Sequence, residues 1–77
     1  MRLISQDGRI DMPYEGFVLA CNDEKIVVSR DVYSSLKAVI ATYSSKQKIV
    51  EVMKKLRFSF KTGEEFFHFP KDSEVEV

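Results

Sequence analysis

Only one stretch of this chain, residues 43–63 (YSSKQKIVEVMKKLRFSFKTG), carries a sustained helical pattern. Its apolar side chains recur at spacings of three and four and form a single stripe: Ile49, Val52, Met53, Leu56 and Phe60. The remaining sequence consists of short alternating or apolar runs that are typical of β-strands. We therefore expect an α+β fold: a mainly antiparallel sheet of five or six short strands, with two N-terminal hairpins, one amphipathic helix packed on one face and a short C-terminal strand.

Capping residues mark both ends of the predicted helix. Ser44 is a suitable N-cap, and Gln47 three residues later can complete a capping box. Gly63 fits the left-handed position that follows many helices. Two hydrophobic residues lie off the stripe, since Phe58 is almost opposite its centre and Val50 is beyond its edge. Either the last turn frays and Phe58 folds under, or the back of the helix contacts an oligomer or partner surface.

The first hairpin is predicted from Asp7-Gly8, which lies between two alternating runs. This pair favours a two-residue type I′ turn, whose central residues both need positive φ. The register that follows pairs Leu3 with Met12 and sorts the apolar side chains onto one face.

The other strands are read from composition. A second hairpin is predicted for residues 17–21 and 25–29, and residues 17–21 are apolar on both faces, which favours a central strand. Residues 36–43 are predicted to be a strand, although a buried helix start is an alternative. Residues 65–69 form an aromatic strand, with Phe67 and Phe69 on one face and Phe66 and His68 on the other. The acidic tail, residues 71–77, is expected to fray at the end of a single domain spanning residues 1–77.

The length of 77 residues limits how stable the domain can be. A chain this short buries only about 60% of its unfolded surface. The lone Cys21 excludes an internal disulfide, so association into a homodimer is one expected source of stability. No apolar run reaches the roughly 20 residues of a membrane span, and no signal-peptide pattern opens the chain. We expect a soluble, cytoplasmic protein with no membrane partner.

The charges are segregated along the chain, although the net charge is zero. Residues 46–61 hold six bases and one acid, whereas residues 64–77 hold five acids and one base. Either the acidic end lies against the basic helix and neutralises it, or two surface patches of opposite sign exist and one meets a partner.

No residues converge on a catalytic pattern. His68 has no cysteine or serine motif nearby, and Cys21 lies in an apolar run where burial would make the thiol inert. The three glycines are dispersed and form no phosphate loop. The sequence therefore predicts no catalytic residue, no metal site and no cofactor, and we expect a protein that is not an enzyme.

Three blocks of the sequence together resemble a group of small proteins encoded by phages and prophages of Firmicutes. These blocks are MRLISQDGRIDMPYE, ATYSSKQKIVEVMKKLR and FFHFPKDSEVEV, and they cover about two-thirds of the chain. The resemblance implies a phage or mobile-element origin but no mechanism. Residues 17–35 match nothing in that group and are a place where a specialised function could reside.

Two functions are expected from these observations. The first is a non-enzymatic phage-derived protein that binds a host factor stoichiometrically, with an anti-CRISPR-like block of a defence nuclease as the example. The alternative is an oligomeric binder of an anionic ligand, a signalling nucleotide or nucleic acid, held by the basic helix. A third reading is a phage structural or housekeeping protein. The candidate binding residues are Arg9, Lys48, Lys54, Lys55, Phe58, Lys61, Glu64, Glu65 and Asp72.

Overall fold

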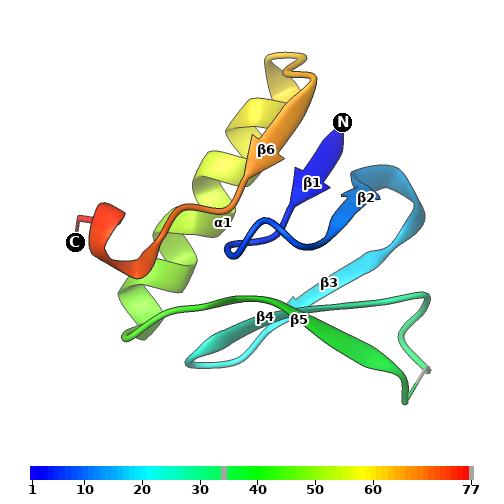
Figure 1. Cartoon of the computed structure of the whole chain (residues 1–77), viewed down its shortest axis with the longest axis horizontal. Coiled ribbons are helices and arrows are strands. Elements are labelled where there is room, and N and C mark those ends of the chain that lie inside the picture. The colour runs from blue at the N-terminus through cyan, green and yellow to red at the C-terminus, as the bar shows by residue number, and fades with distance from the viewer. Residues whose placement is uncertain (34, 77) are drawn as a thin grey trace.

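The computed structural model describes residues 1–33 and 35–76. Within them the chain forms six short strands, one α-helix and two 3-10 turns (Figure 1). The elements in chain order are β1 (Arg2–Ile4), β2 (Asp11–Pro13), η1 (Tyr14–Gly16), β3 (Val18–Cys21), β4 (Lys25–Ser29), β5 (Lys37–Thr42), α1 (Lys46–Lys61), β6 (Phe66–His68) and η2 (Asp72–Glu74).

The fold is α+β, as the sequence predicts, but the expectation of a single sheet is wrong. The strands form two three-stranded sheets, with the orders β2-β1-β6 and β3-β4-β5. β2 is one edge of the first sheet. Its last residue, Pro13, has no backbone N–H with which to bond a further strand, and η1 follows directly after it. On the other side β6 runs parallel to β1, with Leu3 opposite Phe67.

The first hairpin has the predicted register but a different turn. Leu3 pairs with Met12 as expected. Gly8 has a φ of 78°, whereas no residue other than glycine has a positive φ in the described parts, so Asp7 cannot occupy a type I′ turn. Instead the buried Ser5 hydroxyl donates to Asp7 Oδ1 at 2.6 Å and accepts from the Ile10 N–H at 3.0 Å. These side-chain hydrogen bonds stabilise a wider turn.

The second hairpin is confirmed, but its first strand is not central. β3 and β4 pair antiparallel around a turn in which the Asn22 side chain accepts from the N–H groups of Glu24 and Lys25. β4 lies in the middle of its sheet and β3 lies at the edge. Cys21 is consequently exposed, in contrast to the burial expected from its apolar neighbours.

A glutamine side chain joins the two sheets. Gln6, in the turn after β1, donates from its backbone N–H to the Ile40 carbonyl at 2.9 Å. Its side-chain amide donates to the Thr42 carbonyl at 2.9 Å and accepts from the Thr42 N–H at 3.0 Å. The β1–β2 turn thereby imitates a strand along β5 and covers one end of that sheet edge.

The helix begins one residue later than predicted. Ser45, not Ser44, is the N-cap, and its side chain accepts from the Lys48 N–H. The predicted end is confirmed, because Thr62 caps the helix and Gly63 follows with a φ of 79°. Ile49, Val52 and Leu56 of the predicted stripe are buried and Met53 is partly buried. Phe60 was predicted to belong to the same stripe but is 49% exposed, and its ring packs against Tyr14 at a centroid distance of 5.1 Å.

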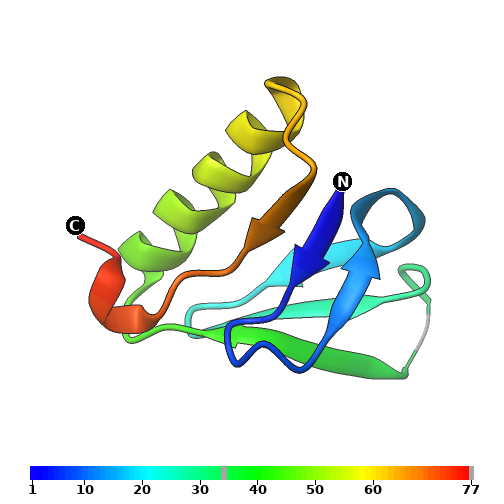
Figure 2. The same cartoon turned by 45° about the horizontal axis from the view of Figure 1, so that its top comes forward.

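A single apolar core joins the helix to both sheets. Figure 2 shows α1 running alongside β6, with the β3-β4-β5 sheet forming the lower layer of the view. The buried cluster consists of Leu3, Met12, Ile26, Val28, Ile40, Ala41, Tyr43, Ile49, Val52, Leu56, Phe69 and Val75.

The C-terminal residues differ from the frayed tail that the sequence predicts. Val75 is 3% exposed and belongs to the core. Asp72 Oδ1 accepts from the backbone N–H of Ser44 at 2.8 Å and from its hydroxyl at 3.1 Å. Residues 72–75 therefore pack at the start of α1, where Asp72 binds Ser44 and Lys48 and Val75 is buried, while Val77 lies outside the described residues.

Candidate functional site: the outer face of the helix

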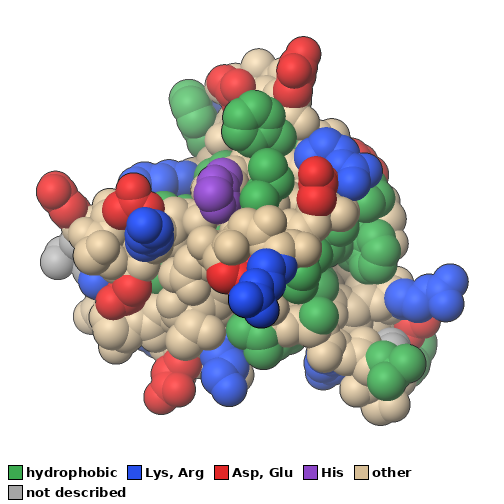
Figure 3. All heavy atoms as spheres, in the orientation of Figure 1, with side chains coloured by type: hydrophobic (Ala, Val, Ile, Leu, Met, Phe, Trp, Pro, Cys, Tyr) green, Lys and Arg blue, Asp and Glu red, His purple; other side chains and the backbone are tan. Residues whose placement is uncertain are grey.

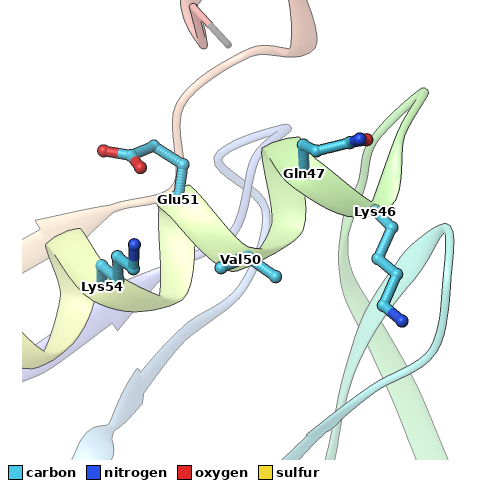
Figure 4. A pocket seen from close by; sticks show the side chains of 5 residues that line it. All are labelled: Lys46, Gln47, Val50, Glu51 and Lys54. Carbon is cyan, nitrogen blue, oxygen red and sulfur yellow. The ribbon is translucent and has the colours of Figure 1, made fainter.

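The side of α1 that points away from the core carries a mixture of bases and hydrophobic side chains. We call this surface the helix face and define it by Lys46, Gln47, Val50, Glu51, Lys54, Lys55 and Phe58. Figure 4 shows five of these side chains projecting from successive turns of α1. They line an open hollow of about 410 Å³. Since this surface is open and shallow, it suits contact with a partner surface better than enclosure of a small substrate.

Phe58 is the most exposed hydrophobic side chain of the helix, at 66%. It does not fold under a frayed turn, because the helix continues to Lys61 and the Thr62 N–H donates to the Phe58 carbonyl at 3.0 Å. The structure therefore excludes the reading in which Phe58 folds under, and the ring lies exposed on the outer side of the helix. A second hollow of about 540 Å³ lies at its base, lined by Glu51, Lys54, Lys55, Phe58, Ser59 and Phe67.

The positive charge of the helix is only partly neutralised by the acidic tail. Lys48 Nζ lies 3.5 Å from Asp72 Oδ1 and donates to the Asp72 carbonyl at 2.8 Å. Within residues 1–33 and 35–76, Lys54, Lys55, Arg57 and Lys61 have no hydrogen-bonded or ion-paired acid. Lys48 is therefore neutralised by the acidic tail, whereas the remaining bases of the helix form an exposed positive surface.

Asp72 has an altered acidity that fits its structural position. The backbone N–H of Ser44 lowers the pKa of the Asp72 carboxyl, and the Ser44 hydroxyl and Lys48 add to this effect against a smaller opposing contribution from burial. A carboxylate held in this way stabilises the fold, and it leaves Lys48 and Asp72 less available to an outside ligand.

The structure brings three of the predicted site residues together, namely Lys54, Lys55 and Phe58, which share one hollow. Lys61 is the last residue of α1, and Glu64 and Glu65 lie exposed in the connection to β6. Arg9 lies in the turn between β1 and β2, outside both hollows of the helix face.

A second exposed apolar surface lies outside the residues that the sequence singled out as candidate binding residues. Between β4 and β5, Val32 is 70% exposed, Tyr33 is 94% exposed and Leu36 is 83% exposed. We call these three residues the tip. Hydrophobic side chains are visible at the corresponding end of the molecule, at the lower right of Figure 3. The available signal was three large hydrophobic residues in a connection that has neither glycine nor proline.

Groups that could perform chemistry are dispersed. In the described residues no group of three or more His, Cys, Asp or Glu side chains is placed to hold a metal ion. His68 is exposed on β6 and Cys21 is exposed on β3. Burial raises the pKa of the Tyr43 hydroxyl, with Asp72 and Glu74 adding to the shift, and this hydroxyl donates to the Pro70 carbonyl at 2.7 Å. Its position indicates a role in joining the tail to the core.

The described part of the chain has no helix with the length and hydrophobicity needed to cross a bilayer. Comparisons with protein-family models, with curated proteins and with solved structures find no match to this chain.

Proposed function

We propose that this chain is a non-enzymatic binding protein that acts stoichiometrically on a protein partner through the helix face. The observation that carries the proposal is Phe58, an aromatic side chain 66% exposed on a helix whose neighbouring lysines have no acidic partner in the described residues. Aromatic side chains are enriched among the few residues that dominate protein interfaces. Surface bases around such an anchor accelerate association with an acidic partner.

The partner that fits this surface has an apolar side chain or pocket for Phe58 and acidic groups around it. The aliphatic stems of Lys54 and Lys55 can pack beside the ring while their amino groups remain at the rim. Val50, 45% exposed, adds apolar surface about two helical turns toward the N-terminus from Phe58. The contact would therefore have an apolar centre and a charged rim, as protein interfaces commonly do.

The resemblance of three sequence blocks to phage and prophage proteins supports a host factor as the partner. A protein without convergent catalytic groups can act on such a factor by occupying one of its surfaces. Host defence nucleases are the first candidates to test, since stoichiometric inhibition of a nuclease needs only a covered surface. This assignment of a partner class depends on the resemblance and not on the helix face.

Photo-crosslinking tests the proposed surface directly. A photoreactive phenylalanine analogue replaces Phe58 in one variant and Phe66 in a matched control, because both side chains are well exposed, at 66% and 59%. After irradiation in a host lysate, the position-58 variant should give one adduct of 1:1 stoichiometry and the position-66 variant should not.

Charge reversal then tests the role of the bases. Lys54→Glu with Lys55→Glu should abolish the adduct, whereas Lys25→Glu with Lys71→Glu makes the same change in net charge away from the helix face and should preserve it. Equal crosslinking from positions 58 and 66, or an adduct that survives the Lys54 and Lys55 changes, would contradict the proposal. For a nuclease partner, inhibition should rise linearly with added protein and be complete at equal amounts.

A second candidate is supported by the hollow that Lys54, Lys55 and Phe58 share, because two bases beside an aromatic ring can bind a phosphate and stack a base. Native mass spectrometry of the freshly purified protein separates the two. Extra mass of a few hundred daltons would favour a bound nucleotide, and its affinity should fall steeply with salt. A clean chain mass together with a crosslinked protein would favour the protein partner.

A further inference from the structure

The tip has the characteristics of a contact surface and lies apart from the helix face. Val32, Tyr33 and Leu36 project from the connection between β4 and β5, and none of them lines either hollow of α1. Next to them, an open hollow of about 750 Å³ is lined by Gly16, Phe17, Arg30, Asp31, Tyr33 and Leu36. The same region of the molecule therefore offers both a projecting aromatic side chain and a recess of mixed polarity.

We propose that the tip is the interface of a symmetric homodimer, in which Tyr33 of each copy packs into the hollow beside Phe17 of the other. In a two-fold symmetric contact the same patch must complement itself. A patch with one projecting ring and one adjacent recess meets that condition, because each ring fills the recess opposite. Phe17, 38% exposed, supplies an aromatic wall for the ring that enters.

The charged residues beside the tip favour a second copy of the chain over a partner whose surface charge is all positive or all negative. Arg30 and Asp31 are adjacent and both exposed, so a two-fold axis can bring Arg30 of one copy to Asp31 of the other, twice. The helix face is not self-complementary in charge. It holds several bases against Glu51, so two copies meeting there would repel each other.

Local hydrogen bonds already hold the start of the connection in place. Asp31 Oδ1 accepts from the Tyr33 N–H at 2.8 Å, and the Ser29 hydroxyl donates to the Asp31 carbonyl at 3.0 Å. Tyr33 is therefore presented by a backbone that is ordered before contact, which lowers the entropic cost of association.

The exposed apolar area is of the size that such an interface needs. With about 150–250 Å² for an aromatic side chain and less for Val and Leu, the tip and Phe17 expose on the order of 450 Å². A standard interface covers about 800 Å² on each partner, so these four side chains supply roughly half of it. The largest apolar patch on a typical monomer is about this size and is often functional.

Sedimentation equilibrium of the full chain over a range of concentrations tests the proposal. The wild-type protein should approach twice the chain mass of 8.9 kDa as its concentration rises. The double variant Val32→Ser with Tyr33→Ser should raise the dimer dissociation constant by about 30-fold or more, as expected for removal of an interface hot spot. Circular dichroism of the variant confirms that it is folded, since both side chains are exposed and contribute little to the core.

Phe58→Ser is the control, because it removes another well-exposed aromatic side chain, 66% exposed, from the helix face. It should leave the dimer intact and reduce binding of the partner, so the two proposals can fail separately. A wild-type mass of 8.9 kDa at all concentrations up to about 1 mM would overturn the dimer, since its dissociation constant would then lie above about 1 mM. Association that weak would not form a dimer in a cell. Dimerisation that survives the Val32 and Tyr33 changes but is lost in Phe58→Ser would place the interface on α1 and would equally overturn it.

Discussion

Replacing Val75 by alanine tests whether the C-terminal residues belong to the core. Val75 is 3% exposed, belongs to the buried cluster that joins the helix to both sheets, and lies in the segment that the sequence alone predicts to be frayed. The substitution removes two methyl groups, worth about 0.8 kcal/mol each in transfer free energy, and adds a cavity term. We expect a loss of about 2–3 kcal/mol in the free energy of unfolding.

That loss is large for a chain of 77 residues. At 0.05–0.15 kcal/mol per residue, the whole domain has roughly 4–12 kcal/mol of stability. Each kcal/mol shifts the midpoint of thermal unfolding by about 4–8 °C in a domain of this size, so Val75→Ala should lower Tm by roughly 8–24 °C. Urea unfolding followed by circular dichroism measures the free-energy difference, and a thermal scan measures the shift in Tm.

Val50→Ala is the control for this measurement. Val50 is 45% exposed on the outer side of α1, and the change should stay within about 0.5 kcal/mol of the wild type. Any effect should be in the stabilising direction, since alanine is the better helix former. If Val75→Ala is as stable as Val50→Ala, the tail does not contribute to the core and the reasoning from burial fails.

Two further predictions concern acid and backbone geometry. The pKa of Asp72 is lower in the folded state than its ordinary value of 3.8, so the unfolded chain binds more protons at acidic pH. The stabilisation by this carboxylate is present above pH 3.8 and is lost as pH falls through the pKa of the folded state. Asp72→Asn should therefore flatten the acid limb of a plot of unfolding free energy against pH. An unchanged acid limb would exclude this carboxylate as its source. Gly63→Ala should cost roughly 1–2 kcal/mol because Gly63 has a φ of 79°, although its Cβ would meet nothing within 4 Å. Gly16→Ala also adds its Cβ to open space but needs no left-handed backbone. It should therefore be neutral or stabilise the fold by about 0.4–1 kcal/mol. Equal costs at Gly16 and Gly63 would refute the argument that the positive φ of Gly63 causes the loss.

The sequence predicts this fold where the signals are local. The spacing of Ile49, Val52 and Leu56 specifies which side of the helix is buried, and the alternation around Asp7-Gly8 specifies the pairing of Leu3 with Met12. Both depend on residues within a few positions of each other, where periodicity and turn preference act directly.

The missed features depend on contacts between distant residues. The N-cap moves from Ser44 to Ser45 because Ser44 is bound by Asp72, which lies 28 positions away. β6 completes the first sheet by pairing with β1, a parallel arrangement for which no short-range pattern exists. The tail is charged and short, yet Val75 is buried because a site for one side chain exists beside the helix.

The candidate site was predicted in part by the same local reasoning. Helical geometry alone places Phe58 opposite the buried stripe, and it lies there in the structure, beside Lys54 and Lys55. That Lys48 is occupied by Asp72 could not be read from the sequence, because the two are 24 residues apart. The exposure of Val32 and Tyr33 was not predicted, because the burial of a hydrophobic residue in a connection depends on contacts with distant parts of the chain.

The pairing of β1 with β6 also constrains how the chain can be synthesised and folded. Arg2 pairs with Phe66, so 64 residues must be added after the first strand before its second neighbour exists. At 5–20 residues per second, a ribosome needs roughly 3–13 s for that interval. Throughout it, the edge of β1 that β6 will occupy stays open to other chains. The second sheet, whose strands are consecutive, can form while the first still waits, so the half of the molecule that carries the tip should acquire its structure before the half that begins and ends the chain.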